Sequence, residues 1–191
     1  MNTSDKNNLT LLHLSLIPGI GPNSVLKVAK NIFDNFCANQ KNVLQNLDFR
    51  LDKIYDYNST DFKNVFGLSE SLASTLTKGL ADKKILEEEL KLIEKYKIDL
   101  LTFLDLEYPQ NLKQIYSPPV VLYCKGAKLS ETDKSIAVVG ARKAKSYAQD
   151  VINDVVPKLV KNGYTIISGG ALGVDSMAHK AALKVDWKSV V

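Results

Sequence analysis

The sequence predicts an α/β protein in which a Rossmann-like parallel sheet, incomplete in this chain, follows a small all-α domain. Two patterns predict the sheet. Residues 136–139 and 164–167 are short, continuous β-branched and apolar runs, which is typical of strands that are buried on both faces. Each run ends in a turn that contains glycine and leads into a helical pattern, as in a βαβα unit. Helical periodicity upstream of residue 98 predicts the all-α domain.

The chain begins with two predicted helices around a glycine turn. Residues 9–17 form an apolar helical segment, and residues 22–36 form an amphipathic one. A helix, a turn with Gly19 and Gly21, and a second helix are the pattern of a helix-hairpin-helix motif, whose backbone N–H groups bind a DNA phosphate. We therefore expect a secondary DNA contact at this turn, with Lys27 adding positive charge. A plain αα-hairpin is the alternative, and the slightly acidic charge of this half leaves both readings open.

The next segments complete the predicted helical domain. Residues 60–80 repeat the pattern of helix, turn and helix in a weaker form, with Gly67 as the single glycine of the turn. Residues 83–97 are amphipathic, and their charged side chains form a solvated face. A strand pattern starts next, so we place the domain boundary there. We expect residues 1–97 to form a small helical domain with the helix-hairpin-helix pattern, and residues 98–191 to form the first part of the Rossmann-like domain.

Residues 98–126 are predicted to open the Rossmann-like domain with strand candidates at 98–103 and 120–124. We expect the second of these strands to join the parallel sheet. Asp105, between them, is expected to cap the helical turn that follows it. A catalytic pair of Asp105 with Glu107 is the alternative, but neither a nucleophile nor a metal ligand accompanies these carboxylates in the sequence.

The turn after residues 136–139 is basic. The strand stops at Gly140, where the backbone can approach a ligand without a Cβ atom in the way, and Arg142, Lys143 and Lys145 follow at once. This cationic cluster lies just past the carboxyl end of a parallel strand, which is where open α/β sheets bind ligands. The sequence therefore predicts an anion site here.

The second turn of the βαβα unit repeats this arrangement without charge. Ser168, Gly169, Gly170 and Gly173 supply a hydroxyl group and permissive backbone before a helix whose amino-terminal N–H groups would face an anion. Asp175 lies in the first turn of that helix, where a carboxylate suits the helix macrodipole.

Two further features belong to the carboxyl-terminal part. Pro157 lies inside the helical stretch 146–161 and predicts a kink or a break near Val155, because proline lacks an N–H group and clashes with the preceding turn. Residues 188–191 are predicted to begin a third parallel strand. A sheet that stopped there would keep a long apolar edge, so we expect the chain to be a fragment of a longer protein.

Composition and charge narrow the class of protein. The 191 residues are 45% hydrophobic and 24% charged, as in soluble globular proteins, with neither an apolar run of membrane-spanning length nor an amino-terminal signal sequence. We therefore expect a cytoplasmic protein without a membrane partner. Two Cys and two His without metal-ligand spacing predict neither a disulfide framework nor a metal site. The net charge is −1 over residues 1–105 and +5 over residues 106–191, which indicates a polyanionic partner for the second part.

Four segments resemble the DNA-processing protein A (DprA/Smf) family, in family order and at family-like spacing. They are DLEYP at 105–109, SPPVVLYCKG at 117–126, VVGARKA at 138–144 and SGGALGVDSMAHKAAL at 168–183. The chain departs from the family pattern at Ala141, where Ser is frequent, and at Ala148, where Gly is frequent. The helical part is similar to the SAM-like domain that precedes the Rossmann-like domain in many members.

The resemblance implies a single-stranded DNA-binding protein of natural transformation, or competence, and of DNA recombination, which is not an enzyme. Members of this family protect incoming DNA and help to load the RecA recombinase onto it. RecA and, in the full-length protein, a second copy in a homodimer are therefore the expected partners, and no cofactor is expected. The resemblance places these residues at the DNA phosphates: Gly140, Arg142, Lys143, Ser168, Gly169 and Gly170. Lys145 and Gly173 in the same turns are further candidates for phosphate contact, and a role as solvated surface residues is the alternative for Lys143 and Lys145.

Arg142 is expected to matter most, because a guanidinium group grips two phosphate oxygens. Tyr147 and Tyr164 are candidates for base stacking, but packing in the core or at its rim is the favoured prediction. The rival function is that of a nucleotide-binding Rossmann enzyme similar to the LOG nucleoside monophosphate phosphoribohydrolases, whose PGGxGTxxE motif does not occur in these 191 residues. A dinucleotide oxidoreductase fits less well, because no GxGxxG follows Val139, and a purely structural interaction module leaves the two aligned turns unexplained.

Overall fold

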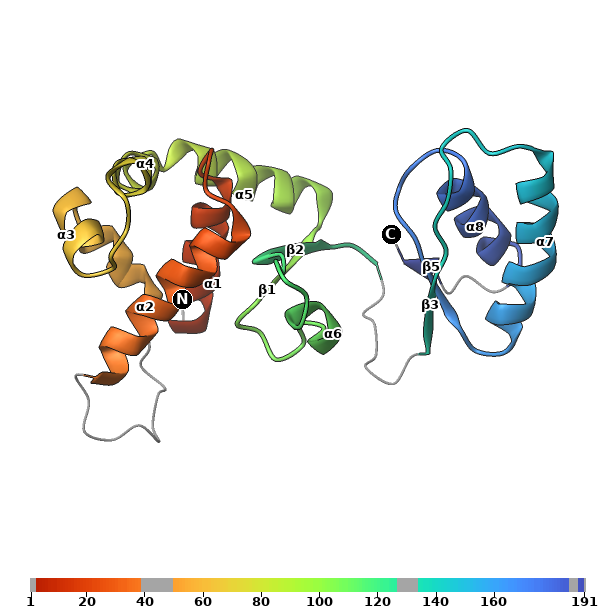
Figure 1. Ribbon diagram of the computed structural model, residues 1–191, viewed down its shortest axis with the longest axis horizontal. Helices are drawn as coiled ribbons and strands as arrows, with labels where there is room; N and C mark the ends of the chain where they lie inside the picture. The colour runs from red at the N-terminus through yellow and green to blue at the C-terminus, as the bar shows by residue number, and fades with distance from the viewer. Residues whose placement is uncertain (1–2, 39–49, 127–133, 186–188, 191) are drawn as a thin grey trace. The chain divides into compact units, whose positions relative to one another are not determined.

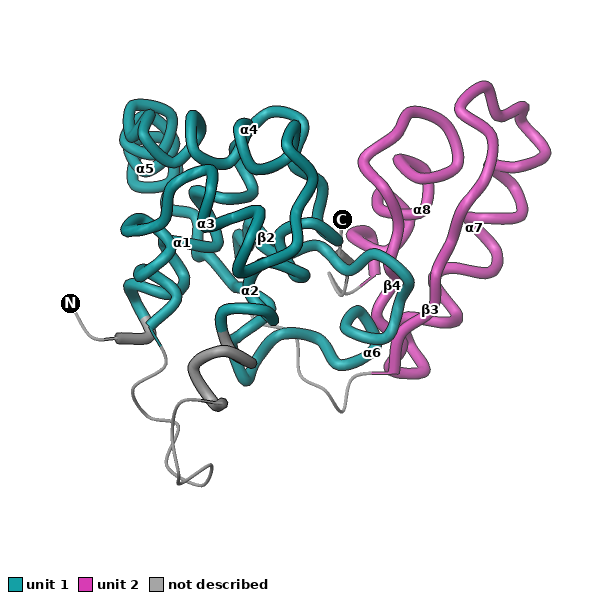
Figure 2. Tube along the Cα trace, turned by 60° about the vertical axis from the view of Figure 1, so that its left-hand side comes forward, with its two compact units in different colours: residues 1–126 teal, residues 127–191 magenta. Residues whose placement is uncertain are grey.

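The computed structural model describes residues 3–38, 50–126, 134–185 and 189–190 (Figure 1). The chain divides into two compact units, residues 1–126 and residues 127–191, which Figure 2 colours separately. The first unit is mainly helical and contains a small antiparallel sheet, whereas the second combines a parallel sheet with helices. The predicted fold class, a helical region followed by an incomplete Rossmann-like sheet, is confirmed.

The described residues carry two negative findings. None of their helices combines the length and the apolar character that a membrane span requires. Nor do their His, Cys, Asp and Glu side chains gather anywhere into a group that could hold a metal ion.

The helices of the first unit follow the predicted pattern of two hairpins. Their bounds are α1 Thr3–Leu16, α2 Pro22–Ala38, η2 Leu51–Asp56, α3 Ser59–Asn64, α4 Glu70–Ala81 and α5 Lys84–Tyr96. Polar side chains determine where the two helices of the second hairpin, α3 and α4, begin. Asn58 Oδ1 accepts hydrogen bonds from the N–H groups of Thr60 and Asp61, and Asp61 Oδ2 accepts one from the Asn58 N–H, which is a capping box. At the start of α4, Ser69 Oγ accepts from the Leu72 N–H.

One hydrophobic core joins these hairpins. Leu11 and Leu14 of α1, Val28 of α2, Phe62 of α3 and Leu76 of α4 are at most 1% exposed. The apolar positions recur at helical spacing, so each helix turns one stripe of side chains inward. Removal of these side chains from water is the main force that holds the hairpins together.

β1 (Asp99–Thr102) and β2 (Val121–Cys124) form a separate antiparallel sheet in the first unit, with Asp99 opposite Cys124. The predicted strand at 120–124 therefore exists, but the prediction that it joins the parallel sheet is wrong. Its partner is the neighbouring strand of the same unit, which runs in the opposite direction.

Hydrogen bonds tie this small sheet to α1. Thr102 Oγ1 donates to Asn8 Oδ1 (2.9 Å), and Asn8 Nδ2 donates to Asp105 Oδ1 (3.0 Å). The other carboxylate oxygen of Asp105 accepts from the Thr102 N–H (2.6 Å). The prediction that Asp105 caps the following helical turn is therefore wrong, because the N-cap residue of α6 (Gln110–Lys113) is Pro109. Asp105 instead holds β1 against α1.

These contacts explain where the compact units divide. Because β1 and β2 pack with α1, the first unit extends to Gly126, whereas the predicted domain boundary at residue 97 separates α5 from β1. The boundary at residue 97 stays a prediction about the domains of the full-length protein.

The DLEYP and SPP segments contact each other inside the first unit. Tyr108 is completely buried, and its hydroxyl group donates to Pro119 O (2.6 Å). The ring of Phe103 lies beside that of Tyr108, with 5.5 Å between the ring centroids. These contacts hold the connection between β1 and β2 in shape, which gives both segments a structural role.

The second unit is the predicted βαβα unit followed by a third strand. Its elements are β3 Ser135–Ala137, α7 Ser146–Lys161, β4 Thr165–Ile167, α8 Val174–Leu183 and β5 Ser189–Val190. β4 lies between β3 and β5 and pairs with both in parallel, with Ile136 opposite Ile166. The predicted third strand is confirmed, although Lys188 and Val191 at its predicted ends lie outside the described residues.

α7 and α8 pack against each other and against one face of this sheet (Figure 1). The side chains buried between them are Ile152, Val156, Val160, Ile166, Ala178, Ala181 and Ala182. Ala137 and Ile167 belong to the other face and are exposed. The prediction of strands buried on both faces is therefore wrong for β3 and for the end of β4, whereas Thr165 and Ile166 at the start of β4 are both buried.

α7 continues through Pro157 without interruption, so the chain has no helix break near Val155, and the kink, which is the other predicted outcome, stays a prediction. The helix ends in a Schellman motif closed by Gly163, whose N–H group donates to Val160 O (2.9 Å). Gly163 adopts a φ of 81°, in the left-handed region, and the chain reverses there into β4.

Candidate phosphate-binding site

The carboxyl ends of β3 and β4 bring the two predicted turns together. Because the strands are parallel, both turns leave the sheet at the same edge. The Val138 N–H donates to Ile167 O (2.9 Å), and Ser168 Oγ donates to Val138 O (2.6 Å). These bonds join the strand ends at the points where the turns begin. We call the turn after β3 the basic turn (residues 140–145) and the turn after β4 the glycine turn (residues 168–173).

The two turns also touch through their backbones. The Val174 N–H donates to Ala141 O (3.2 Å). Gly173 has a φ of 85°, and a Cβ atom there would lie 2.2 Å from Ala141 O and 2.5 Å from Arg142 O. Only glycine fits this contact, because the left-handed conformation and the close approach both exclude a side chain. Gly173 thereby helps to position the backbone that carries Arg142.

The glycine turn presents backbone N–H groups that have no partner in the described part of the chain. The N–H groups of Gly169, Gly170, Ala171 and Leu172 donate to no acceptor there. They precede α8, whose macrodipole directs its positive end toward the turn. Unpaired N–H groups at the start of a helix attract anions, and phosphate above all.

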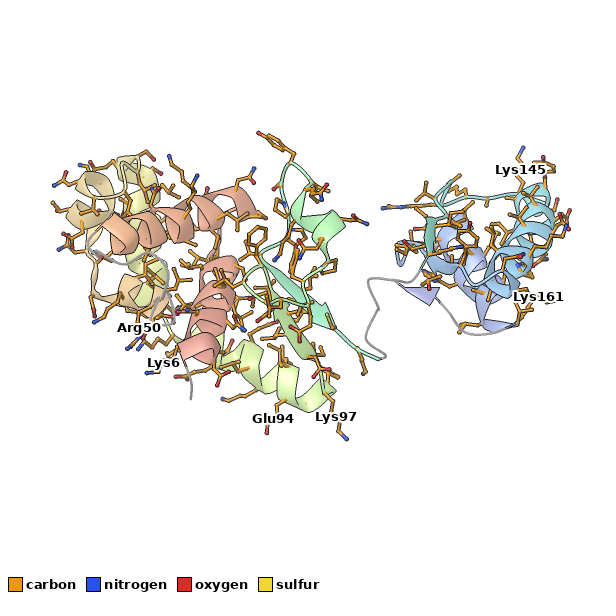
Figure 3. All side chains as sticks on the ribbon, turned by 90° about the horizontal axis from the view of Figure 1, so that it is seen from below. Lys6, Arg50, Glu94, Lys97, Lys145 and Lys161 are labelled. Atoms are coloured by element: carbon orange, nitrogen blue, oxygen red, sulfur yellow. The ribbon has the colours of Figure 1, made fainter. Side chains whose placement is uncertain are left out.

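The basic turn adds three cationic side chains. Arg142, Lys143 and Lys145 are exposed, and none of them forms an ion pair with any residue that the structure describes. Gly140, where this turn begins, is exposed as well. Figure 3 labels Lys145 at the amino end of α7 and Lys161 at the other end, so the basic turn lies at the Lys145 end. Cations and N–H groups without a partner in the described ranges thus meet at one edge of the sheet.

Ser168 differs from the other predicted site residues because it is only 6% exposed. Its hydroxyl hydrogen is engaged with Val138 O, so the side chain positions the glycine turn. Gly169 and Gly170 are exposed and keep their N–H groups available. The hydroxyl group of Ser168 thus helps to position the glycine turn, and phosphate contacts at Ser168, Gly169 and Gly170 stay predictions.

Large apolar side chains lie in or beside the two turns and face the solvent. Val139 and Tyr147 are each 77% exposed, and Leu172 is 78% exposed. The prediction that Tyr147 packs is wrong, whereas Tyr164 is half-buried, with Lys134 Nζ 6.0 Å from its ring centroid. Sequence reasoning missed Val139 and Leu172. The sequence pattern that could have identified both residues is an apolar side chain directly before a glycine of a turn.

The predicted secondary contact lies in the other compact unit. Gly19, Gly21 and Lys27 are exposed, and Gly19 adopts a φ of 84°. Gly21 O accepts a hydrogen bond from the Val25 N–H (3.1 Å) and so begins α2. The predicted helix, turn and helix are present, and a DNA contact at this turn stays a prediction.

Comparison with known proteins identifies relatives of this chain. The family model for DNA recombination-mediator protein A matches residues 99–191, which contain both turns. Protein Smf of Borreliella burgdorferi is 35% identical over an alignment of 139 residues, which covers 69% of this chain and 44% of that protein. DNA processing protein DprA of Bacillus subtilis is 36% identical over 85 residues, or 44% of this chain and 29% of that protein.

The X-ray structure of DNA processing protein A (DprA) from Streptococcus pneumoniae has a similar fold. It matches with a TM-score of 0.68 and 26% sequence identity, over 95% of this chain and 56% of that chain. The chain spans less than half of the length of the two curated relatives.

Proposed function

We propose that this chain, which belongs to the DprA/Smf family of DNA-processing proteins, binds single-stranded DNA at the two turns on the carboxyl edge of its parallel sheet. The observation that carries this proposal is that the N–H groups of residues 169–172 and the guanidinium group of Arg142 have no partner among the residues that the structure describes. The N–H groups and the guanidinium group belong to two turns that are in backbone contact. One phosphate, or two successive phosphates of a DNA strand, can therefore bind to both.

The physical basis of the binding is charge-assisted hydrogen bonding. Phosphate oxygens accept hydrogen bonds from the N–H groups of the glycine turn, and the Arg142 fork holds two oxygens at once. Lys143 and Lys145 raise the local positive potential. The exposed ring of Tyr147 offers a surface for stacking, which unpaired bases can use and paired bases cannot.

The wider role of the full-length protein follows the family. We propose that it acts in natural transformation and recombination, protects incoming single-stranded DNA, helps to load RecA and works in the cytoplasm. In this proposal the site binds phosphate, and no residue is given a catalytic, cofactor-binding or metal-binding role. Because one protomer offers few phosphate contacts, a homodimer would gain affinity through two linked sites.

The experiment is a fluorescence anisotropy titration of a labelled oligothymidine with the full-length protein at two salt concentrations. We expect Arg142→Ala to raise the Kd about tenfold or more, since a hydrogen bond to a charged group contributes about 1.5–3 kcal/mol. Lys161→Ala is the matched control, because it removes an equal charge from the far end of α7. Affinity should also fall steeply with salt, since each neutralised phosphate releases counterions.

Two results would count against this function. Equal affinities of wild type and Arg142→Ala for oligothymidine would show that Arg142 in the basic turn does not contribute to DNA binding. Displacement of the oligomer by a nucleoside monophosphate would instead favour a nucleotide enzyme similar to the LOG proteins.

A further inference from the structure

Asp175 is a buried carboxylate at the glycine turn that the proposed phosphate site does not use. It is the second residue of α8 and is 9% exposed. With the residues that the structure describes, its side chain forms neither a hydrogen bond nor an ion pair. Buried polar groups in folded proteins almost always have a hydrogen-bond partner, so this carboxylate requires a donor from elsewhere.

The carboxylate is aimed at the glycine turn. A Cβ atom on Gly169 would lie 2.7 Å from Asp175 Oδ2 and 3.8 Å from its Cγ. One helical turn later, His179 Nε2 lies 3.2 Å from Gly169 O. The oxygen of Asp175 therefore occupies the space that a side chain at Gly169 would need, and Gly169 belongs to the turn whose N–H groups at 169–172 have no acceptor among the described residues.

A negative charge at this position does not suit a site for phosphate alone. The positive end of the α8 dipole makes an ionised carboxylate less costly there, but it provides no donor for the carboxylate oxygens. A phosphate on the neighbouring N–H groups is repelled by the carboxylate, and this repulsion is strong where little water screens it. The same carboxylate attracts a hydrogen-bond donor that belongs to the ligand.

We propose that Asp175 accepts a hydrogen bond from a donor group of the nucleotide whose phosphate occupies the glycine turn. This inference rests on the proposed function and deepens it, because the site then recognises a nucleotide unit and not phosphate alone. Two parts of a DNA strand carry such donors, namely the N–H groups of the bases and the hydroxyl group of a terminal sugar. Carboxylates accept hydrogen bonds from ribose hydroxyl groups in the same way in dinucleotide-binding sheets.

The direction in which Asp175→Asn changes the affinity for oligothymidine distinguishes this binding role from a purely structural one. Asn keeps the shape of the side chain and removes its charge. We expect the Kd of the full-length protein for oligothymidine to rise about five- to tenfold, since a charge-assisted hydrogen bond is roughly twice as strong as a neutral one. If no donor of the ligand reaches the Asp175 carboxylate, Asp175→Asn should bind oligothymidine as tightly as wild type or more tightly, because the substitution removes the repulsion between the carboxylate and the phosphate. Asp150→Asn, at an exposed carboxylate of α7, controls for the change in net charge.

Modified oligomers identify the donor. An abasic oligomer with a blocked 3′ end offers only phosphate and should bind Asp175→Asn at least as tightly as wild type. N3-methylthymidine removes the base N–H group, and a 3′-deoxy end removes the hydroxyl group. The modification that abolishes the difference between wild type and Asp175→Asn names the donor.

The outcomes distinguish this inference from the proposed function. If Asp175→Asn, folded by circular dichroism, binds oligothymidine as tightly as wild type does, the inference is overturned and the DNA site stands. If wild type binds none of the oligomers, both fall.

Discussion

Gly173 shows how one backbone position controls the proposed site. A side chain there would need a left-handed conformation and would also overlap the carbonyl oxygens of Ala141 and Arg142. Backbone atoms cannot swing aside as the tip of a flexible side chain can. Any larger residue must therefore push the basic turn away from the glycine turn.

Gly173→Ala is expected to lower the free energy of unfolding of the second unit by about 2 kcal/mol or more, because the left-handed conformation alone costs about 1–2 kcal/mol. It should also weaken oligothymidine binding, since Arg142 moves with its turn. Chemical denaturation and anisotropy measure the two effects. Gly163→Ala is the matched control, because Gly163 has a φ of 81° but no atom within 4 Å of its would-be Cβ. An equal loss of DNA affinity in both variants would show that the contact between the turns is unimportant.

At the level of elements, α1, η2 and the end of α4 meet at His13. This side chain is fully buried, with Nε2 3.1 Å from Asp82 O and Nδ1 2.8 Å from the Tyr55 hydroxyl. A carbonyl oxygen can only accept, so Nε2 carries a hydrogen and the neutral ring accepts at Nδ1 from the Tyr55 hydroxyl. Protonation of Nδ1 would reverse this second bond, with the hydroxyl oxygen as acceptor, and would place a positive charge in a buried position, so the neutral ring suits the folded unit.

The stability of the first unit should depend on pH through this residue. Burial lowers the pKa of His13 below its ordinary value of 6.5, although the hydrogen bond to Asp82 opposes the shift. The unfolded chain therefore binds a proton more readily than the folded chain. The free energy of unfolding should keep its full value above about pH 6.5 and decrease as the pH falls toward the lowered pKa.

Denaturation followed by far-ultraviolet circular dichroism at a series of pH values measures this dependence. His13→Gln removes the titrating ring and should flatten the pH dependence, whatever its effect on absolute stability. Parallel losses of stability in wild type and His13→Gln on acidification would assign the effect to another group.

Across the whole molecule, each compact unit has a hydrophobic core of its own. Phe62 and Leu76 lie in the core of the first unit, and Val156 and Ile166 lie in that of the second. The two cores share no buried side chain within the described residues. Units built in this way are expected to unfold separately.

Phe62→Ala should therefore lower the stability of the first unit by about 3–5 kcal/mol, and Ile166→Ala that of the second by about 2–5 kcal/mol. Hydrogen exchange read out by mass spectrometry reports each unit separately. Oligothymidine binding should survive Phe62→Ala and be lost with Ile166→Ala, because only the second core supports the two turns. A loss of protection in both units on either substitution would mean that the chain unfolds as one body.

Local patterns were sufficient to predict most elements and the candidate turns. The β-branched runs identified β3 and β4, and the glycines and cations that follow them identified the turns. The exposure of Tyr147 and the hydrogen bond of Ser168 were not predictable in this way. Both depend on which side chains and carbonyl groups lie nearby in space, and these come from distant parts of the second unit.

Periodicity, glycines and charge thus account for the helical hairpins, the βαβα unit and the residues of the basic and glycine turns, because these features act over a few neighbouring residues. Folding of the whole chain decided the rest. β2 pairs with β1 and not with the parallel sheet, and β1 is held to α1 through Asn8, whose partners Thr102 and Asp105 lie 94 and 97 residues away. The burial of Asp175 against Gly169 is likewise a product of packing. Such contacts depend on many side chains that become neighbours only when the chain folds, so no local pattern encodes them.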